Sequence, residues 1–350
     1  MVKKSTLVMI TALVFGIVFG LFAFADDFNV AEGKTYTLSP EPSSNYPDPG
    51  TKLTDGSANF SWGDMVGLEN PENNPVITVD LGDVYDTVSY VAIKVMYSKA
   101  SGVNLPQYFI ASISEDGELY DDLGMGMKYV EAPVASDTIA TLYWATKDMP
   151  GYGRYVKIEV APTGTAWTMI AEVVIGNGEI PEEYNVSYDQ AVDTTDAEVV
   201  SVGKPYLLVP VPSETYPDPD SVKVTDGFAR YSWGDMIGFD NPDTNPTVVI
   251  DLEEETDVVK VSGSFMRSYA SAVNLPTSLL VFVSDDGVDF TPVGMAIKTD
   301  PSPVENEAIN QFYWEASAPV KARYVKVEIR PRGAAWTMLA EVTVWAAAGE

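Results

Sequence analysis

The tryptophans are the residues best suited to bind a ligand, because an indole ring can stack on the apolar face of a sugar. Six of the seven tryptophans fall into equivalent pairs: Trp62 with Trp233, Trp144 with Trp314, and Trp167 with Trp336. Trp62 and Trp233 are each followed by Gly-Asp, which predicts a loop whose aspartate, Asp64 or Asp235, can hydrogen-bond to sugar hydroxyls.

Other aromatic residues divide between ligand contact and the core. Four of them are further candidates for ligand contact: Tyr46, Tyr216, Trp167 and Trp336. Trp144 and Trp314 lie in strand-like sequence, and we expect them in the core. Large aromatic side chains mostly fill cores, so a purely structural role stays open for all six paired tryptophans.

An Asn-Leu-Pro loop is a third candidate, with Asn104 in the first half of the chain and Asn274 in the second. The residues before it differ between the halves: Tyr97 and Lys99 in the first, Arg267 and Tyr269 in the second. If this loop lines a ligand site, Arg267 gives the second site a different specificity. The alternative is a simple turn between two strands.

The composition excludes several classes of enzyme. The sequence has no histidine and no cysteine, which rules out Ser-His-Asp, Cys-His and histidine-zinc sites as well as disulfides. Paired carboxylates could serve a glycosidase, but no pair lies in a catalytic pattern, so we expect no enzymatic activity. The net charge of −30 disfavours nucleic acid and anionic lipid as partners, and favours neutral ligands and divalent cations.

The chain is an internal duplication. Five motifs of the first half return about 170 residues later: Tyr46-Pro47-Asp48, Lys52-Leu53-Thr54-Asp55-Gly56, Trp62-Gly63-Asp64, Asn104-Leu105-Pro106 and Ala166-Trp167-Thr168-Met169. We predict one domain over residues 26–176 and a second over residues 200–346. Residues 177–199 are polar and acidic and are predicted to form a linker.

Each copy alternates between apolar and polar residues with the period of a β-strand. In residues 76–81, for example, Ile77, Val79 and Leu81 fall on one face. After the first 25 residues no long stretch shows the helical period, and turn residues separate the short apolar runs. This pattern predicts an all-β fold with one β-sandwich in each copy.

Residues 1–25 have the features of a secretory signal peptide. Lys3 and Lys4 precede an uncharged, mostly apolar run that ends in Ala23-Phe24-Ala25, a small-x-small cleavage pattern. We therefore expect a protein that is secreted or held at the cell surface. The alternative is an uncleaved segment that stays as a membrane anchor.

The order of motifs in both copies resembles the discoidin family, also called coagulation-factor C-type domains. The sequence of motifs is Gly-Lys-x-Tyr, Tyr-Pro-Asp, Thr-Asp-Gly, Trp-Gly, Val-Asp-Leu, Ser-x-Asp-Gly, Arg-Tyr-Val-Lys, and Trp followed by Ala-Glu-Val. These domains belong with the galactose-binding-like folds and the family 32-like carbohydrate-binding modules. The resemblance implies two tandem jelly rolls that bind ligands with loops at one end, and many bacterial members bind sugars.

The same resemblance implies a structural calcium ion in each copy. In similar modules the ion joins an early loop to the last strand, which here would use Asp55 with Glu172 and Asp226 with Glu341. Calcium accepts such hard oxygen ligands. The alternative is an aspartate that caps its own turn, with an unrelated glutamate elsewhere.

These observations predict a non-catalytic, exported protein that binds neutral carbohydrate or a cell-surface component through the end loops of two jelly-roll modules. The alternative is a structural or adhesive envelope protein whose modules contact proteins instead of sugar.

Overall fold

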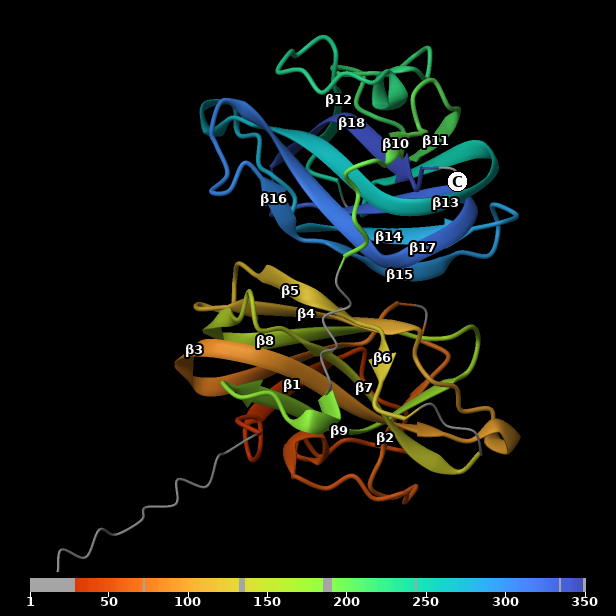
Figure 1. Ribbon diagram of the computed structural model, residues 1–350. Helices are drawn as coiled ribbons and strands as arrows, with labels where there is room; N and C mark the ends of the chain where they lie inside the picture. The colour runs from red at the N-terminus through yellow and green to blue at the C-terminus, as the bar shows by residue number, and fades with distance from the viewer. Residues whose placement is uncertain are drawn as a thin grey trace, which may run out of the picture.

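The chain folds into two β-sandwich modules, shown in Figure 1. The computed structural model describes residues 29–71, 73–131, 136–184, 191–242, 244–333 and 335–348. The predicted signal peptide lies outside these residues. Each module contains one nine-stranded sheet, so the predicted all-β fold with two tandem jelly rolls is confirmed. Among the described residues, no helix is both long enough and apolar enough to cross a membrane.

The first module uses nine strands, which pair antiparallel. They are β1 (Thr35–Ser39), β2 (Val66–Glu69), β3 (Val76–Tyr97), β4 (Tyr108–Ser114), β5 (Asp121–Gly126), β6 (Lys128–Tyr129), β7 (Thr138–Ala145), β8 (Gly151–Ala161) and β9 (Trp167–Asn177). Short 3-10 helices at Lys52–Thr54 and Lys99–Ser101 lie in two of the connections.

The second module has the same topology apart from two strands. Its strands are β10 (Glu198–Val199), β11 (Tyr206–Val209), β12 (Ile237–Asp240), β13 (Thr247–Arg267), β14 (Ser278–Ser284), β15 (Thr291–Ala296), β16 (Lys298–Asp300), β17 (Ala308–Arg330) and β18 (Trp336–Ala346). One strand, β17, covers the segment that forms β7 and β8 in the first module, and β10 is an additional short strand. Its 3-10 helices occupy Lys223–Thr225 and Tyr269–Ser271, the positions equivalent to those of the first module.

The long strand β3 joins the two layers of the first sandwich. Its first part pairs with β1 and β8, and its last part pairs with β7 and β9. The register shifts between Asp80 and Tyr85, where the strand bends from one layer to the other. Strand β13 bends in the same way, with a register shift between Asp251 and Thr256.

The core lies between these layers, and the sequence pattern identified it. Ile77, Val79 and Leu81 are fully buried, as their alternation predicted. Trp144 is also buried, and Trp314 packs half-buried against the second core, so both belong to the cores as expected. Each module therefore has an apolar centre of its own.

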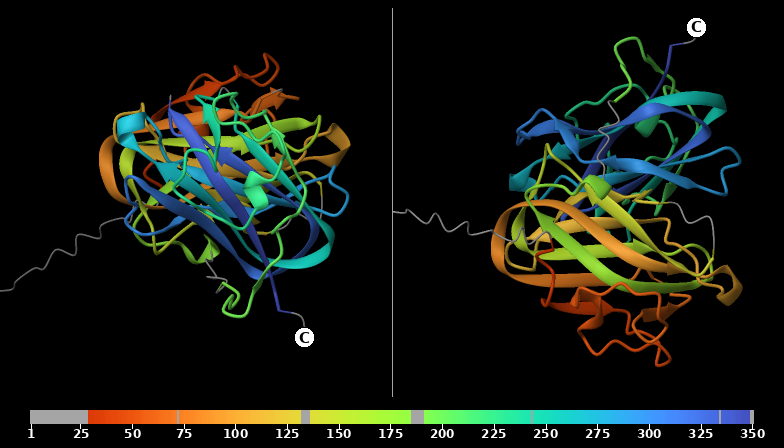
Figure 2. Two further views of the ribbon diagram at one scale, coloured as in Figure 1. Left: turned by 90° about the horizontal axis from the view of Figure 1, so that it is seen from above. Right: turned by 60° about the horizontal axis from the view of Figure 1, so that its bottom comes forward.

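The modules stack on each other through β4 and β5 of the first and β14, β15 and β17 of the second (Figures 1 and 2). A separate apolar cluster fills this junction, and in it Tyr108 meets Phe282 edge-to-face with ring centres 5.9 Å apart. Ile110 and Leu280, which are equivalent in the repeat, both belong to this cluster. The two copies thus use corresponding faces to contact each other.

A buried ion pair closes the junction beside this cluster. The Arg330 Nε donates to Asp122 Oδ2 at 2.9 Å, and its Nη1 donates to Glu159 Oε2 at 3.1 Å. The Asp122 side chain is 3% exposed and also accepts hydrogen bonds from Thr277 and Ser278 of the second module. Arg330 and these hydrogen bonds hold the pKa of Asp122 below its ordinary value. The junction is therefore a specific polar contact as well as an apolar one.

The segment between the modules contacts both of them. Tyr184, in the 3-10 helix Glu182–Tyr184, is buried against Tyr90 and Tyr143 of the first module, with ring centres 5.1 Å and 5.4 Å away. Further along, the Val192 amide donates to the Ala316 carbonyl of the second module at 2.8 Å.

Removing Arg330 should disrupt the junction. In the Arg330→Ala variant Asp122 keeps its buried position without its cation, a change that costs about 3–5 kcal/mol for a buried pair. We expect a clearly lower thermal midpoint in calorimetry, or two separate transitions where the modules come apart. Arg154→Ala is the control, because the Arg154–Asp80 pair is half exposed and should contribute less than about 1 kcal/mol. Equal effects of the two substitutions would contradict this account.

Candidate functional site

Three aromatic residues that lie far apart in the sequence meet at the outer end of the first module. The centre of the Tyr46 ring lies 5.8 Å from the centre of the Trp62 ring, and the two rings are tilted by 37°. The centre of the Tyr46 ring also lies 5.4 Å from that of Trp167, in an edge-to-face arrangement. The loop between β1 and β2 carries the first two, and β9 begins at the third. We call this group the first aromatic cluster.

The first aromatic cluster borders a cavity of about 470 Å³. Its three aromatic side chains are half-buried, so part of each ring faces solvent. Asn45, Ser101 and Val103 complete the lining. The arrangement combines ring faces with a few polar groups, which suits a sugar, whose ring has an apolar face and hydroxyls at its edge.

Buried methionines support the cluster from below. Met65, Met96 and Met169 are fully buried beneath Trp62 and Trp167. Gly67 lets Tyr46 approach: a Cβ at Gly67 would lie 2.7 Å from the Tyr46 Cβ and 2.8 Å from the Met169 sulfur. The glycine is thus required for the position of the tyrosine ring.

Lys52 holds together the two parts of the β1–β2 loop that carry Tyr46 and Trp62. Its ammonium group donates to the Pro47 carbonyl at 2.8 Å and to the Met65 carbonyl at 3.1 Å, so one side chain links the segment after Tyr46 to the segment after Trp62. The Lys-Leu-Thr-Asp-Gly motif alone does not predict this role of the lysine. The return of the lysine as Lys223 in the second copy is the sequence signal that indicates it.

Backbone hydrogen bonds fix Trp167. Its amide donates to the Gly102 carbonyl at 3.0 Å, and its carbonyl accepts from the Asn104 amide at 3.2 Å. Gly102 has φ of +70°, a left-handed conformation that favours glycine. The Asn-Leu-Pro loop therefore positions the tryptophan through its backbone, and the Asn104 side chain is not among the residues that line the cavity.

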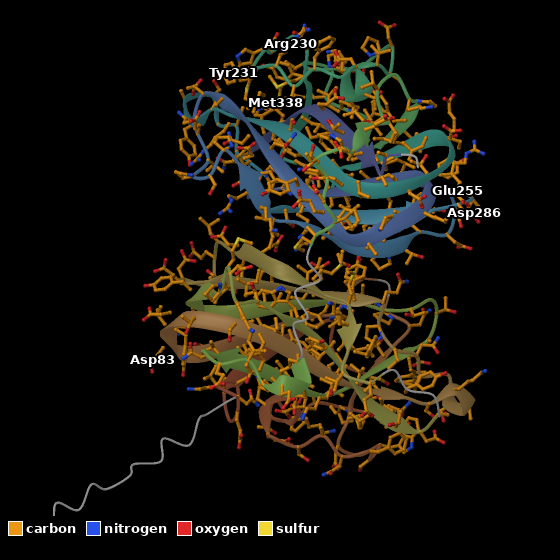
Figure 3. All side chains as sticks on the ribbon, viewed as in Figure 1. Asp83, Arg230, Tyr231, Glu255, Asp286 and Met338 are labelled. Carbon is orange, nitrogen blue, oxygen red and sulfur yellow. The ribbon has the colours of Figure 1, made fainter. Side chains whose placement is uncertain are left out.

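The second module builds the same group, the second aromatic cluster. The ring centre of Tyr216 lies 5.7 Å from that of Trp233, with the rings tilted, and 5.3 Å from that of Trp336, edge-to-face. Lys223 donates to the carbonyls of Pro217 and Met236, as Lys52 does in the first module. Figure 3 shows this outer end, where Met338 lies below the loop that carries Arg230 and Tyr231.

The remaining predicted ligand residues lie apart from the aromatic clusters or at their edges. Asp64 and Asp235 are exposed in the turns after Trp62 and Trp233, and Asp64 does not line the first cavity. Arg267 and Asn274 line a different cavity, at the junction of the modules.

The predicted metal residues form one arrangement in both modules. Glu172 is almost fully buried, and its Oε1 accepts from the Gly56 amide at 3.2 Å, next to the exposed Asp55. Glu341 repeats this contact with Gly227, at 3.2 Å, beside Asp226.

One oxygen of each buried glutamate lacks a partner. Oε2 of Glu172 and Oε2 of Glu341 are buried without a hydrogen bond within the described part of the chain. Burial, with a smaller contribution from the nearby aspartate, raises the pKa of each carboxyl to about 8. An orphaned carboxylate oxygen in both copies fits a bound cation. Among the described residues no three acidic side chains gather to hold a metal ion, so carbonyl oxygens or water would supply most of its ligands.

Residues 213–342 match the model of the F5/8 type C domain family. No curated protein matches this sequence.

Similar solved structures include a fucolectin from the serum of striped bass, Morone saxatilis, with 16% identity over 92% of this chain and 99% of the lectin, and a TM-score of 0.32. CpGH89CBM32-5 from Clostridium perfringens, solved with GalNAc-β-1,3-galactose, has 14% identity over 43% of this chain and 100% of its own, with a TM-score of 0.34. Allantoicase from Saccharomyces cerevisiae has 12% identity, covers 92% of both chains and has a TM-score of 0.31.

The raised pKa values of Glu172 and Glu341 predict a pH dependence of stability in the presence of a chelator. Each carboxyl ionises near its ordinary value of 4.5 in the unfolded chain but near 8 in the folded protein. The stability they contribute is therefore complete below pH 4.5 and is lost as the pH rises to about 8. The double variant Glu172→Gln, Glu341→Gln should lose this part of the pH dependence.

The measurement is the urea midpoint of both proteins between pH 5 and pH 8 in chelator. All other titrating groups are common to the two proteins, so the difference between their profiles reports these glutamates. Parallel profiles would show that the two carboxyls do not have raised pKa values.

Proposed function

We propose that this protein is a non-catalytic carbohydrate-binding protein with one neutral-sugar site in each module. The match of residues 213–342 to the F5/8 type C domain model supports this proposal, as does the return of the same motifs in the first half of the chain. The two sites are the first and second aromatic clusters.

The uncharged lining of the first cavity carries this proposal. The chain has a net charge of −30, yet none of the six residues around this cavity is charged. Its lining consists of aromatic rings, a valine, an asparagine and a serine. A neutral ligand with an apolar face and several hydroxyls matches such a lining, and the absence of acid or base groups there supports binding without catalysis.

The positions of the two clusters favour binding to two separate ligands. The loops of residues 40–65 and 211–236, which carry the clusters, lie at the lower and upper ends of the molecule in Figure 1. The buried Arg330–Asp122 pair holds the modules in this arrangement. We therefore propose that the protein bridges two glycan chains or surfaces outside the cell, after export through residues 1–25.

Substitution of Trp62 or Trp233 should weaken binding to neutral glycans. An aromatic contact is worth about 0.5–1.5 kcal/mol beyond its buried area, so we expect each Trp→Ala variant to lower the affinity of its site by about 3- to 10-fold. A glycan array of the double variant, followed by calorimetry on the best ligand, measures the loss. Trp345→Ala is the control, because this half-buried tryptophan lies at the opposite end of β18 from Trp336.

Agglutination of beads that carry the same glycan tests the bridging. The wild type should agglutinate the beads, and either single variant should need several-fold more protein to agglutinate them while it still binds them. An array that shows no neutral glycan bound by the wild type would refute the proposal and favour an adhesive role toward proteins.

We also propose that calcium binds at Glu172 and Glu341 and stabilises the loops that follow Asp55 and Asp226. Millimolar calcium should raise the thermal midpoint relative to chelator, because an ion that binds only the folded state stabilises it. The Glu172→Gln, Glu341→Gln variant should lose most of the shift, since glutamine keeps a carbonyl oxygen but removes the only buried negative charge that would face the ion. Asp64→Ala is the control and should keep the shift, and an unchanged wild-type midpoint would disprove calcium binding.

A further inference from the structure

Two cavities meet along the junction of the modules, with volumes of about 400 Å³ and about 300 Å³. Asp122, Thr277 and Arg332 line both of them, so we treat them as one junction groove. We propose that the junction groove binds an oligosaccharide that contains carboxylated sugars, at a site separate from the neutral-sugar sites of the aromatic clusters.

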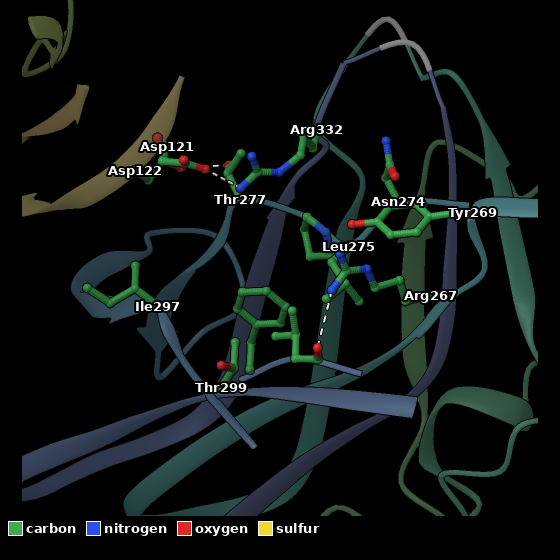
Figure 4. A pocket seen from close by; sticks show the side chains of 13 residues that line it. Asp121, Asp122, Arg267, Tyr269, Asn274, Leu275, Thr277, Ile297, Thr299 and Arg332 are labelled. Atoms are coloured by element: carbon green, nitrogen blue, oxygen red, sulfur yellow. Dashed lines mark hydrogen bonds and ion pairs between the residues drawn. The ribbon is translucent and has the colours of Figure 1, made fainter. Parts of the chain in front are cut away.

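Arg267 supplies a cation at one end of the groove (Figure 4). Its guanidinium group lies over the Tyr269 ring at 4.2 Å and makes one hydrogen bond, a long one of 3.4 Å, to the Val304 carbonyl. It forms no ion pair with any described residue. Most of its donors are therefore free to bind the carboxylate of a ligand.

Lys157 supplies a second cation at the other end, from the first module. It lies in the smaller cavity, with its ammonium group 4.3 Å from the centre of the Tyr120 ring. Like Arg267, it has no ion-pair partner within the described part of the chain. Each end of the groove thus pairs one cation with one tyrosine ring.

Three of the four acidic residues of the groove are bound by donors of the protein, and two of these three share Arg330. Asp122 is bound by Arg330, and Asp121 forms an ion pair with Arg332. Glu159 accepts from Arg330 and from Asn74. Glu118 is the acid of the groove without such a partner, and it is exposed at the rim. Four basic and four acidic residues line the groove, whereas the whole chain has 21 basic and 51 acidic residues. The groove is therefore much less acidic than the rest of the chain, and the two cations at its ends, which have no ion-pair partner among the described residues, favour an anionic group on the ligand.

The walls of the groove favour a sugar acid over a simple anion. Tyr269 is 57% exposed, so its ring can contact a sugar face while Arg267 binds the carboxylate. Leu275 and Phe312 form a buried apolar wall, and Asn274 offers an amide for hydroxyl groups. The combined volume of the two cavities is in the range of pockets that enclose small ligands.

The binding of trigalacturonic acid, measured by calorimetry, tests this proposal, with the carboxyl-reduced trisaccharide as the neutral counterpart. The acid should bind at least tenfold more tightly than the neutral form and more weakly at high salt. Arg267→Gln and Lys157→Gln should each lower the affinity for the acid about tenfold, because each removes a charge-assisted hydrogen bond. Thermal midpoints show whether the variants remain folded.

Lys326→Gln is the matched control. Lys326 is the repeat equivalent of Lys157 and also lies over an aromatic ring, at 4.0 Å from Phe282, but it lines a different cavity. This variant should bind the acid like the wild type, and so should the Trp62→Ala, Trp233→Ala double variant. Equal affinity for the acid and its neutral form, or a loss in the tryptophan variant and none in Arg267→Gln, would overturn the proposal without touching that for neutral sugars.

Discussion

The ion pair between Arg330 and Asp122 fixes the relation of the two modules, and both the junction groove and the opposed aromatic clusters depend on it. A buried pair of this kind adds little net stability compared with apolar packing, but it is costly to break, because a lone charge would remain away from water. Arg330 satisfies two carboxylates of the first module at once. The contact therefore specifies one orientation of the modules.

The duplication explains why this contact is specific. The two copies place corresponding strands at the junction, so a symmetric contact would have like residues facing each other. Instead, Asp121 and Asp122 occur in the first copy where the second has Thr291 and Pro292. Arg330 and Arg332 occur in the second copy where the first has Ala161 and Thr163. The first copy therefore carries negative charges at the junction and the second carries positive charges, so the two corresponding surfaces bind each other specifically.

Outside the junction the copies keep the same architecture for a physical reason. Each aromatic cluster combines a long loop, which carries the tyrosine and one tryptophan, with the start of the last strand, which carries the other tryptophan. The loop needs a lysine to hold its two parts together and a glycine against the tyrosine ring. Lys52 and Gly67 have their equivalents in Lys223 and Gly238. The left-handed residue before the Asn-Leu-Pro loop varies, since Gly102 is replaced by Ala272 with φ of +54°. The hydrogen bond to the tryptophan amide survives this change, at 3.0 Å in both copies.

The sequence by itself determined the duplication, the strand faces and the chemical class of the candidate residues. Alternation such as that of residues 76–81 is local, and burial of one strand face follows from it directly. The repeated motifs also predicted that Tyr46, Trp62 and Trp167 act in a site, although not that they form a single cluster.

Only the tertiary structure decided which of these residues meet. Arg267 and Asn274 were predicted in the same set as the tryptophans, but their strand and loop face the neighbouring module and not the outer end. Glu172 accepts from Gly56, Glu341 accepts from Gly227, and Arg330 pairs with Asp122, each across more than 100 residues of chain. Such contacts depend on how the strands pack in three dimensions, and the local pattern of residues does not predict that packing.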